Sequence, residues 1–478
     1  MATFNLIRNS RVFFTTNVAA GTGIVAASGF TTANSQELQV LDGFTFSQAT
    51  NADTVTISEA GATPTRGQRS FNTSLGTVDF SFSTYMRPRL SSTLIKCEES
   101  PLWNALLSNT ALATANIASA GTFTYAAGVL TMTGTHAFKV GEVYVVTGVV
   151  GLGASQFNTA VKVTAVTGTT VAVFTYLVIP TATFSSGNFV VPTVTFSRSA
   201  WNEFPAIAAD TTGIITPYSE LTSALSNKNT LLTFGMLMTV DGVTYAIDNC
   251  ALDQAVVDFG LDGIAMVAWT GKGTALRQLG TNISYSTAAD PVLTGGVTGT
   301  IAGKNTTAGF ITNKLSTVTL VSNIGGVSGT AYTLALTGGS ITIANGITYV
   351  TPANLGVVNQ PVGYYTGTRA ISGSITAYLR TGSTNTAGLL STLLAAAPTS
   401  AGVEPKFKLQ LEIGGATATT RVEVQVDGAM VQIPTIDAQA VMSTTINFTA
   451  QGSESAQSAT AGYDIENTND IEIRYFAA

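Results

Sequence analysis

Through most of its length the chain alternates apolar and polar residues with a period of two, and short Gly-containing segments interrupt the alternation. Successive side chains of a strand point to opposite faces of a sheet, so this period is typical of strands with one buried face. Thr, Val, Phe and Tyr fill many of the alternating positions, and these residues favour strands. The sequence therefore predicts a mainly β protein with antiparallel strands.

Two segments depart from the alternation and predict short helices. Residues 100–109 (SPLWNALLSN) begin with Ser100, which can cap a helix, and Pro101, which suits the first helical position. Residues 387–397 (AGLLSTLLAAA) are followed by Pro398, which cannot continue a helix. Each predicted helix follows a predicted strand, so the same order of elements occurs twice.

The strands that precede these helices reveal an internal repeat. Residues 78–87 (VDFSFSTYMR) align with residues 371–380 (ISGSITAYLR), 293 positions further on. Residues 248–273 align without gaps with residues 427–452, at a separation of 179. The matched positions, which we take to be structurally equivalent, are Tyr85 with Tyr378, Arg87 with Arg380, Asp248 with Asp427, Asp258 with Asp437 and Trp269 with Phe448. We interpret the aromatic pairs as shared core packing and the aspartates as caps of turns.

The unequal separations predict how the chain is divided. The first copy holds 114 more residues between its matched segments than the second, so it carries an insertion. We predict a first domain formed by residues 1–116 and 198–289, an inserted small all-β domain at residues 117–197, and a second domain at residues 290–478. The predicted fold is two tandem β-sandwich or barrel domains, each with a short flanking helix, plus the insertion.

Charge and composition exclude several functions. Only 10% of the residues are charged, and the net charge is −6 at pH 7, which argues against tight binding of nucleic acid. The two cysteines, Cys97 and Cys250, and the single histidine, His136, form no cluster with the spacing of metal ligands. The Gly-rich segments at Gly151 and Gly271 do not fit a phosphate-binding loop, and we interpret them as hairpin turns. We predict no enzymatic activity, no cofactor and no membrane span.

The opening block of the chain resembles a known family. The segments NSRVFFTTNV, LQVLDGFTFSQATNADTVTISEAG and TPTRGQRSFNTSLGTVDFSFSTYMRP are similar to the N-terminal part of the tail tube proteins of tailed bacteriophages. The inserted stretch resembles a small β module found in phage structural proteins, on the pattern of His136, Phe138, Gly141 and Asn158.

The resemblance implies a structural virion protein that polymerises into stacked rings and forms the conduit for DNA ejection. It implies lateral and axial contacts with further copies of the chain, a tape-measure protein inside the tube, and tail terminator or baseplate proteins at its ends. Double-stranded DNA would be present only in transit. The implied location is the virion tail, after assembly in the host cytoplasm.

Two other classes of protein share some of these features. A repetitive β-rich adhesin or surface-layer protein would also be rich in Thr and Gly and poor in charge, but it should carry an export signal or an anchor. A carbohydrate-active enzyme of a tail spike should show clustered acids with tryptophan subsites, whereas the three tryptophans are dispersed along the sequence.

The repeat and the charge lead to three expectations about an assembled tube. The insertion should project from the exterior, because it would block a lumen. The lumen should have a net negative potential, so that DNA slides through it. Tube proteins with one sandwich per subunit close rings of six, so a chain with two copies should form a homotrimer with pseudo-hexameric character.

Overall fold

The architecture described below is that of a computed structural model of the chain. The structure describes the chain except for the following residues: 1–9, 28, 31–33, 42, 59–65, 92–93, 108–113, 117–120, 137, 139–142, 152, 177–179, 183–193, 199–200, 205–206, 211–212, 216–217, 223–230, 241–242, 280–308, 325–326, 354, 356–357, 397–405, 416–419, 438–440, 451–469 and 478.

The protein is mainly β, as predicted, and most of its strands fall into two sets that we call the first unit and the second unit. The first unit contains β1 (Ser10–Thr15), β2 (Ser35–Leu38), β3 (Thr45–Ser58), β4 (Arg66–Tyr85), α1 (Ser100–Leu107), β18 (Phe234–Val240), β19 (Val243–Asp258), β20 (Met266–Gly273) and β21 (Ala275–Gln278). The second unit contains β22 (Thr317–Ile324), β23 (Val327–Leu334), β24 (Leu336–Ala344), β27 (Ala370–Tyr378), α3 (Thr386–Ala396), β28 (Lys406–Ile413), β29 (Arg421–Val431), β30 (Thr435–Asp437), β31 (Ser443–Ala450) and β32 (Glu472–Phe476). The two predicted helices are confirmed as α1 and α3.

The two units pair their strands in the same pattern. In the first unit the antiparallel pairs are β1–β2, β1–β18, β18–β19, β19–β20, β19–β21, β20–β4 and β4–β3. In the second unit they are, in the same order, β22–β23, β22–β28, β28–β29, β29–β31, β29–β32, β31–β27 and β27–β24.

Irregularities of the ladders recur at matching places. The β18–β19 ladder shifts between Phe234 and Met236, and the β28–β29 ladder shifts between Phe407 and Leu409. A β-bulge bends a strand and increases its local twist, so a bulge in the same place gives both units the same bend.

The ladders also give the register between the two units, and this register differs from the gapless alignment. Phe82 of β4 pairs with Trp269, whereas Ile375, at the matching position of β27, pairs with Ile446. The connection from Asp258 to β20 is two residues longer than the connection from β30 to β31, which explains the shift. By strand register, therefore, the counterpart of Trp269 is Ile446 and not Phe448.

A backbone hydrogen bond supports this corrected register. The N–H of Met86 donates to the carbonyl of Ala265 over 2.9 Å, and the N–H of Leu379 donates to the carbonyl of Met442 over 2.9 Å. Met86 and Leu379 are 293 positions apart, and Ala265 and Met442 are 177 apart. The separation between equivalent residues of the two units is thus 179 up to the end of β19 and 177 from the start of β20.

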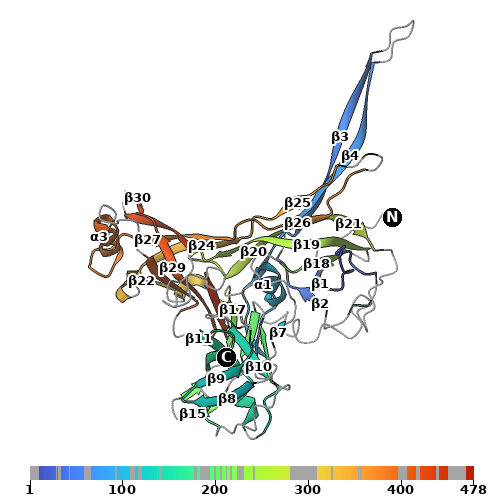
Figure 1. Cartoon of the computed structure of the whole chain (residues 1–478). Coiled ribbons are helices and arrows are strands. Elements are labelled where there is room, and N and C mark those ends of the chain that lie inside the picture. Colours follow the sequence, from blue (N-terminus) through green and yellow to red (C-terminus); the bar gives the residue numbers. More distant parts are fainter. Residues whose placement is uncertain are drawn as a thin grey trace.

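The two units share one continuous sheet. β19 of the first unit pairs on one edge with β20 and on the other edge with β24 of the second unit, from Gln254 opposite Ala344 to Asp258 opposite Ser340. The resulting order across the sheet is β3, β4, β20, β19, β24, β27 and β31. In Figure 1, β19, β20 and β24 lie above α1 and β18.

The main core lies beneath this sheet and includes α1. The indole N–H of Trp103 on α1 donates to the hydroxyl of Tyr475 on β32 over 2.8 Å. The ring of Trp103 also meets Trp269 edge to face, with ring centroids 4.6 Å apart. The C-terminal strand of the second unit therefore packs against the helix of the first, and these two tryptophans, although dispersed in sequence, are in contact.

The inserted stretch has its own sheet of seven strands. Its elements are β7 (Thr114–Asn116), β8 (Gly121–Ala126), β9 (Val129–Gly134), β10 (Val143–Thr147), α2 (Ala154–Phe157), β11 (Ala160–Thr167), β12 (Val171–Tyr176) and β13 (Thr195–Arg198). Phe138, Phe174 and Phe196 lie at the centre of a separate hydrophobic cluster. Figure 1 shows this sheet on the side of the molecule opposite the long β3–β4 hairpin.

The residues of the predicted module pattern have structural roles in this insertion. The side chain of Asn158 accepts a hydrogen bond from the N–H of Val149 over 2.9 Å and donates to the carbonyl of Val149 over 3.1 Å. His136 is buried, and its Nδ1 accepts a hydrogen bond from the N–H of Phe138 over 3.3 Å. Both residues fix turns between strands.

The remaining strands flank these parts. They are β5 (Arg89–Ser91), β6 (Leu94–Lys96), β14 (Trp201–Phe204), β15 (Ile207–Asp210), β16 (Gly213–Ile215), β17 (Tyr218–Thr222), β25 (Thr348–Val350) and β26 (Gly363–Tyr365). β17 pairs with β32 and so ties the segment after the insertion to the second unit. No helix among the described residues is long and apolar enough to span a membrane.

Two local predictions were wrong. Gly271 lies within β20 and not in a hairpin turn, and the segment after Gly151 forms the helical turn α2. The predicted boundary at residue 290 lies outside the described residues.

Candidate functional site

The upper face of the continuous sheet is covered with small polar side chains, and we call it the hydroxyl face. Its residues, all partly or fully exposed, include Ser81, Ser83, Ala268, Thr270, Ser340, Thr342, Ser372, Ser374, Thr445, Asn447 and Thr449. Their neighbours in sequence, such as Phe82, Trp269 and Ile343, point into the core on the other face. The alternation along each strand thus separates a buried apolar layer from an open polar one.

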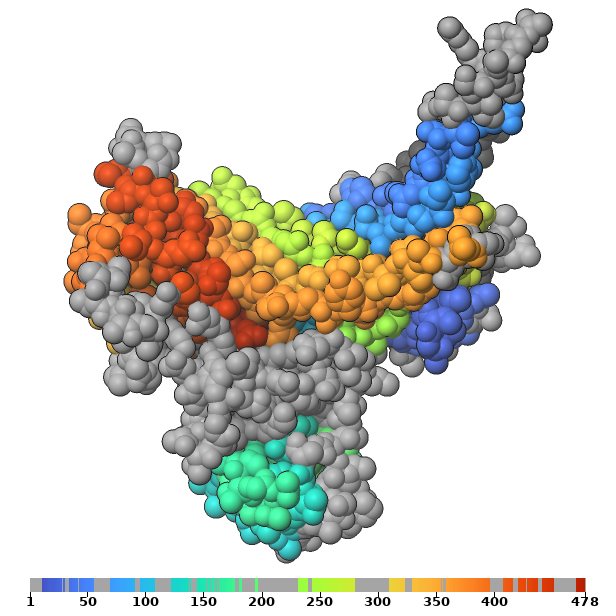
Figure 2. Space-filling view, turned by 45° about the horizontal axis from the view of Figure 1, so that its top comes forward, coloured from blue at the N-terminus to red at the C-terminus, as the bar shows by residue number. Residues whose placement is uncertain are grey.

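Rows of the hydroxyl face cross both units, with two apolar residues, Ala268 and Val256, at the centre of one row. The ladders align one such row in the order Ser83, Ala268, Val256, Thr342, Ser372 and Thr449. Hydroxyl groups on a rigid sheet offer hydrogen bonds but no fixed charge. Figure 2 shows the long hairpin and the second unit at opposite ends of a concave upper surface.

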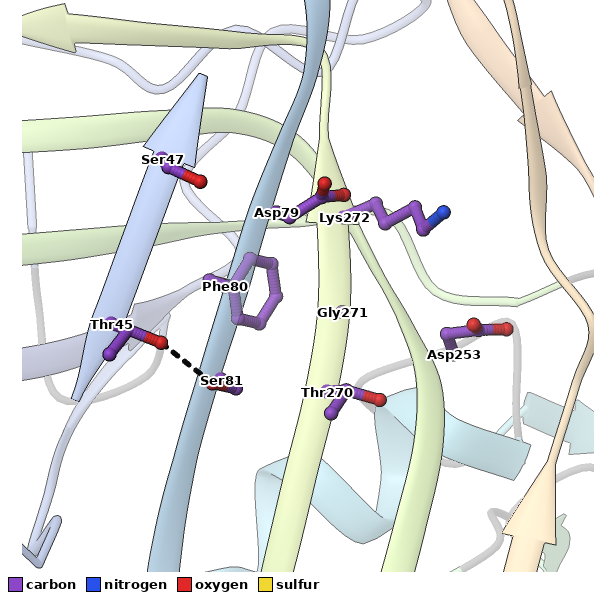
Figure 3. Close-up of a pocket in the computed structure, with 9 residues that line it drawn as sticks. All are labelled: Thr45, Ser47, Asp79, Phe80, Ser81, Asp253, Thr270, Gly271 and Lys272. Carbon is purple, nitrogen blue, oxygen red and sulfur yellow. Dashed lines mark hydrogen bonds between the residues drawn. The ribbon is translucent and has the colours of Figure 1, made fainter. Parts of the chain in front are cut away.

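A hollow of about 290 Å³ lies on this face, over β3, β4 and β20. Thr45, Ser47 and Ser81 line one side of it, and the hydroxyls of Thr45 and Ser81 are 2.7 Å apart (Figure 3). Asp79 and Lys272 lie opposite each other in the β4–β20 ladder and line the hollow as well.

Few charges accompany these hydroxyls. Asp79 and Lys272 carry opposite charges, and Asp258 is exposed at the end of β19. Asp253 lines the hollow, and its carboxylate accepts a hydrogen bond from the N–H of Ile347 over 2.8 Å. The formal charges of these four residues add up to a small negative value. A polyanion would therefore be weakly repelled by this surface and would find no binding site on it.

The predicted equivalent positions Tyr85 and Tyr378 are not core residues in the structure. Tyr85 is half-buried and meets Phe310 edge to face at 5.2 Å, while Tyr378 is 43% exposed. Arg87 is buried, with its guanidinium 4.7 Å from the ring centre of Phe310, whereas Arg380 is exposed. Phe310 therefore covers Tyr85 and Arg87 in the first unit. The matching Tyr378 and Arg380 in the second unit are exposed.

The other aromatic positions and the aspartates have different roles. Trp269 and Phe448 are both buried, in agreement with core packing. Asp248 does not cap a turn, because it lies inside β19. The side chains of Asp427 and Asp437 lie outside the described residues.

Asp248 is buried and forms an ion pair with the partly exposed Arg277, which the sequence did not reveal. Its carboxylate accepts hydrogen bonds from Nη2 of Arg277 over 2.8 Å and from the N–H of Val25 over 2.9 Å. The hydrogen bond from Arg277 to this carboxylate raises the pKa of the guanidinium. The pair joins β19, β21 and the loop after β1.

A buried carboxyl group at the start of α1 was also missed. Glu99 is completely buried, and this burial raises its pKa to about 8. The Tyr475 hydroxyl and the Cys97 thiol face the carboxyl and offset part of that rise. The two cysteines, Cys97 and Cys250, are buried and form no disulfide.

The β3–β4 hairpin forms an arm that extends well beyond the sheet (Figure 1). Phe71 and Val55 on this arm are 51% and 46% exposed. Near its base, the N–H of Leu75 donates to the carbonyl of Asn359, in the loop between β25 and β26, over 2.7 Å. The loop between β25 and β26 therefore supports the base of the arm.

An open sheet, a projecting arm and a separate inserted sheet are features of a structural protein built for assembly. The described residues contain no grouping of metal-ligand side chains. No protein-family model matches the chain. The chain is 26% identical over 452 residues to the tail tube protein pb6 of Escherichia phage T5, covering 93% of this chain and 72% of that protein. This similarity supports a structural role for the chain, as a tail tube protein of the phage virion tail.

Proposed function

We propose that the chain polymerises into stacked rings that form the conduit for DNA ejection. The observation that carries the proposal is the single sheet shared by two units with the same strand pairing. A unit that accepts a neighbouring unit along one sheet edge can accept another in the same way, and repetition of that contact builds a closed wall. The T5 relative, which is named as a tail tube protein, aligns with 93% of this chain.

The two units are, on this proposal, two copies of one domain. Seven strand pairs and a β-bulge recur in both, at matching positions. A ring with six unit positions then needs three chains, so the expected assembly is a homotrimer with pseudo-hexameric symmetry.

The hydroxyl face would line the conduit. Its serines and threonines hydrate well, and its small negative charge prevents the phosphate contacts that would hold DNA in place. Double-stranded DNA would pass through without binding. Before ejection, the same surface would enclose a tape-measure protein.

The arm and the insertion would have different surroundings. The arm, with Phe71 and Val55 exposed, suits an axial contact with the next ring, or with a terminator or baseplate protein at a tube end. The inserted sheet has its own core and needs no neighbour to bury it, so it can project from the exterior. No catalytic role is proposed, and the chain would assemble in the host cytoplasm.

The relative does not favour the adhesin or surface-layer alternative. Of the three tryptophans, Trp103 and Trp269 are fully buried, so neither is available as a sugar subsite of a tail-spike enzyme. Electron microscopy of the purified protein tests the proposal: we expect hollow tubes of uniform bore. Monomers that never polymerise at high concentration, or flat two-dimensional arrays, would contradict it.

A further inference from the structure

Two strand edges, one at each end of the continuous sheet, lack a partner among the described residues and bear on its assembly. β30 pairs with β31 along one edge only, at residues 435–437. Residues 45–48 of β3 pair with β4 along one edge only. Unpaired edges present rows of N–H and C=O groups that can pair with another strand.

The junction inside the chain shows what such an edge binds. The stretch of β19 that corresponds to β30 pairs with β24, and β24 occupies the place in the second unit that β3 occupies in the first. The correspondence is residue by residue: Ser340 pairs with Ser374 as Thr45 pairs with Ser81. The free edge of β30 is therefore equivalent to the edge of β19 that pairs with β24. The free edge of β3 is equivalent to the edge of β24 that pairs with β19.

Apolar residues of the first unit that the second unit covers are buried, whereas their counterparts in the second unit are exposed. Val257 pairs with Ile341 of β24, and the N–H of Ala265 donates to the carbonyl of Ile311 in the segment before β22; both side chains are 0% exposed. Their counterparts Ile436 and Met442 are 41% and 43% exposed. Exposed apolar groups at positions whose counterparts are buried mark a surface that a partner covers.

We propose that β30 of one chain pairs antiparallel with β3 of a second copy, in the register of the β19–β24 junction. The register places Ile433 opposite Ala49, Pro434 opposite Gln48, Thr435 opposite Ser47, Ile436 opposite Phe46 and Asp437 opposite Thr45. Ile436 then meets Phe46 on the core face, as Val257 meets Ile341 within the chain. The inference rests on the proposed tube assembly and specifies its lateral contact.

The register predicts one difference between the two junctions. Asp253 accepts a hydrogen bond from the N–H of Asn345, and the N–H of Phe259 donates to Gly339, so the odd-numbered residues of this stretch face β24. Pro434 corresponds to Ala255 and has no N–H. The junction between chains therefore has one ladder hydrogen bond fewer than the junction within the chain.

Paired cysteines test the register directly. Thr435 and Ser47 would be a non-hydrogen-bonded pair, the geometry in which Cα atoms lie about 4.5 Å apart and a disulfide fits. The variant T435C/S47C is assembled and treated with oxidised glutathione, which accepts two electrons and two protons from the two thiols. The variant V256C/T342C is the matched control, because these residues occupy the same positions of the junction within the chain.

We expect T435C/S47C to yield chains linked to one another on non-reducing gels, and V256C/T342C to yield only an internally linked monomer. The single variants should stay unlinked. If the control oxidises and tubes are visible, yet T435C/S47C remains monomeric, the register is wrong while the tube proposal stands. If no tubes form in any variant or in the unmodified protein, the tube proposal fails first. Crosslinks from T435C alone would show that two β30 edges pair with each other, which also overturns the inference.

A charge at the interface gives a second test that does not depend on oxidation. Ile436→Glu places a carboxylate at a position that is 41% exposed in the single chain but buried in the proposed junction. We expect a folded monomer that no longer polymerises. Val150→Glu is the control, since Val150 is 47% exposed on the insertion and should tolerate the charge. Normal tubes from Ile436→Glu would contradict the inference.

Discussion

The ring of Phe80 on β4 lies directly across Gly271 on β20, so close that a Cβ on Gly271 would overlap it. In the second unit the arrangement is reversed: Phe448 on β31 lies across Gly373 on β27. Gly373 is at the position of Phe80, and Phe448 is at the position of Gly271. Each unit thus fills the same space with one ring, but from opposite strands.

Replacing either glycine with alanine should destabilise the protein. In Gly271→Ala and Gly373→Ala the new methyl group meets both the ring and a backbone carbonyl, and such overpacking costs about 1–3 kcal/mol. Gly260→Ala is the control, because a Cβ there meets nothing within 4 Å. Chemical denaturation measures the free energy of unfolding. Equal stabilities of Gly271→Ala and Gly260→Ala would show that the ring moves aside freely.

This exchange explains a limit of the sequence comparison. The gapless alignment matched Trp269 with Phe448, both aromatic, but strand pairing matches Trp269 with Ile446. The alternation of polar and apolar residues was enough to predict a mainly β protein, and two departures from it predicted both helices. A shift of two residues preserves that alternation, so the pattern could not reveal it.

The ion pair and the hydroxyl face escaped prediction for a similar reason. Asp248 and Arg277 meet because β19 and β21 are adjacent, and nothing in their separation along the chain indicates this. The hydroxyl face requires strands of both units to lie in one sheet. Composition predicted a low charge, but only the topology gathers the serines and threonines on one surface.

Glu99 should make stability depend on pH. The buried carboxyl has a pKa of about 8 in the folded chain and a lower, ordinary one in the unfolded chain. Between these two values the folded state holds a proton that the unfolded state has released, so stability falls as pH rises, by about 1.4 kcal/mol per pH unit for one proton. Above about pH 8 this contribution levels off.

Glu99→Gln should remove this dependence, because the amide is neutral at every pH in the range. We expect the variant to gain stability relative to the unmodified protein as pH rises from 5 to 8. Melting temperatures across that range, measured for both proteins, give the comparison. Parallel curves would mean that Glu99 does not titrate in this interval.

Removing the carboxylate of Asp248 should be costly. Asp248→Ala leaves the N–H of Val25 without its acceptor and Arg277 without its partner. An unsatisfied buried N–H costs about 1–3 kcal/mol, whereas the guanidinium of Arg277, whose side chain is 38% exposed, can be hydrated once its partner is gone. Asp258→Ala, at an exposed position, should change stability by less than about 0.5 kcal/mol. Similar losses in both variants would contradict a specific role for the ion pair.

The insertion should be dispensable for the wall. Its hydrophobic cluster is separate from the main core, and β7 and β13 pair at its root, with Asn116 opposite Phe196. Replacing residues 117–197 with a short Gly-Ser linker should leave a folded chain that still forms tubes. Circular dichroism checks folding, and electron microscopy checks assembly. A folded deletion variant that cannot polymerise would place the insertion in a contact between subunits.

The symmetry of the ring is the most demanding expectation. If the junction between chains repeats the β19–β24 junction, every unit in the wall has the same two neighbours, and a ring of six units closes with three chains. The wall would then look nearly sixfold, because the two junctions share one register. The insertion, carried only by the first unit, would appear three times and reduce the outer surface to threefold symmetry. Joining two units in one chain also raises their effective concentration, which favours closure.

Rotational averaging of tube cross-sections decides between the alternatives, since six outer projections per ring would mean that the second unit does not occupy a wall position. Oxidised T435C/S47C tubes provide an independent count: disassembled rings should end in a covalent species of three chains, and a ladder that continues to six would contradict the trimer.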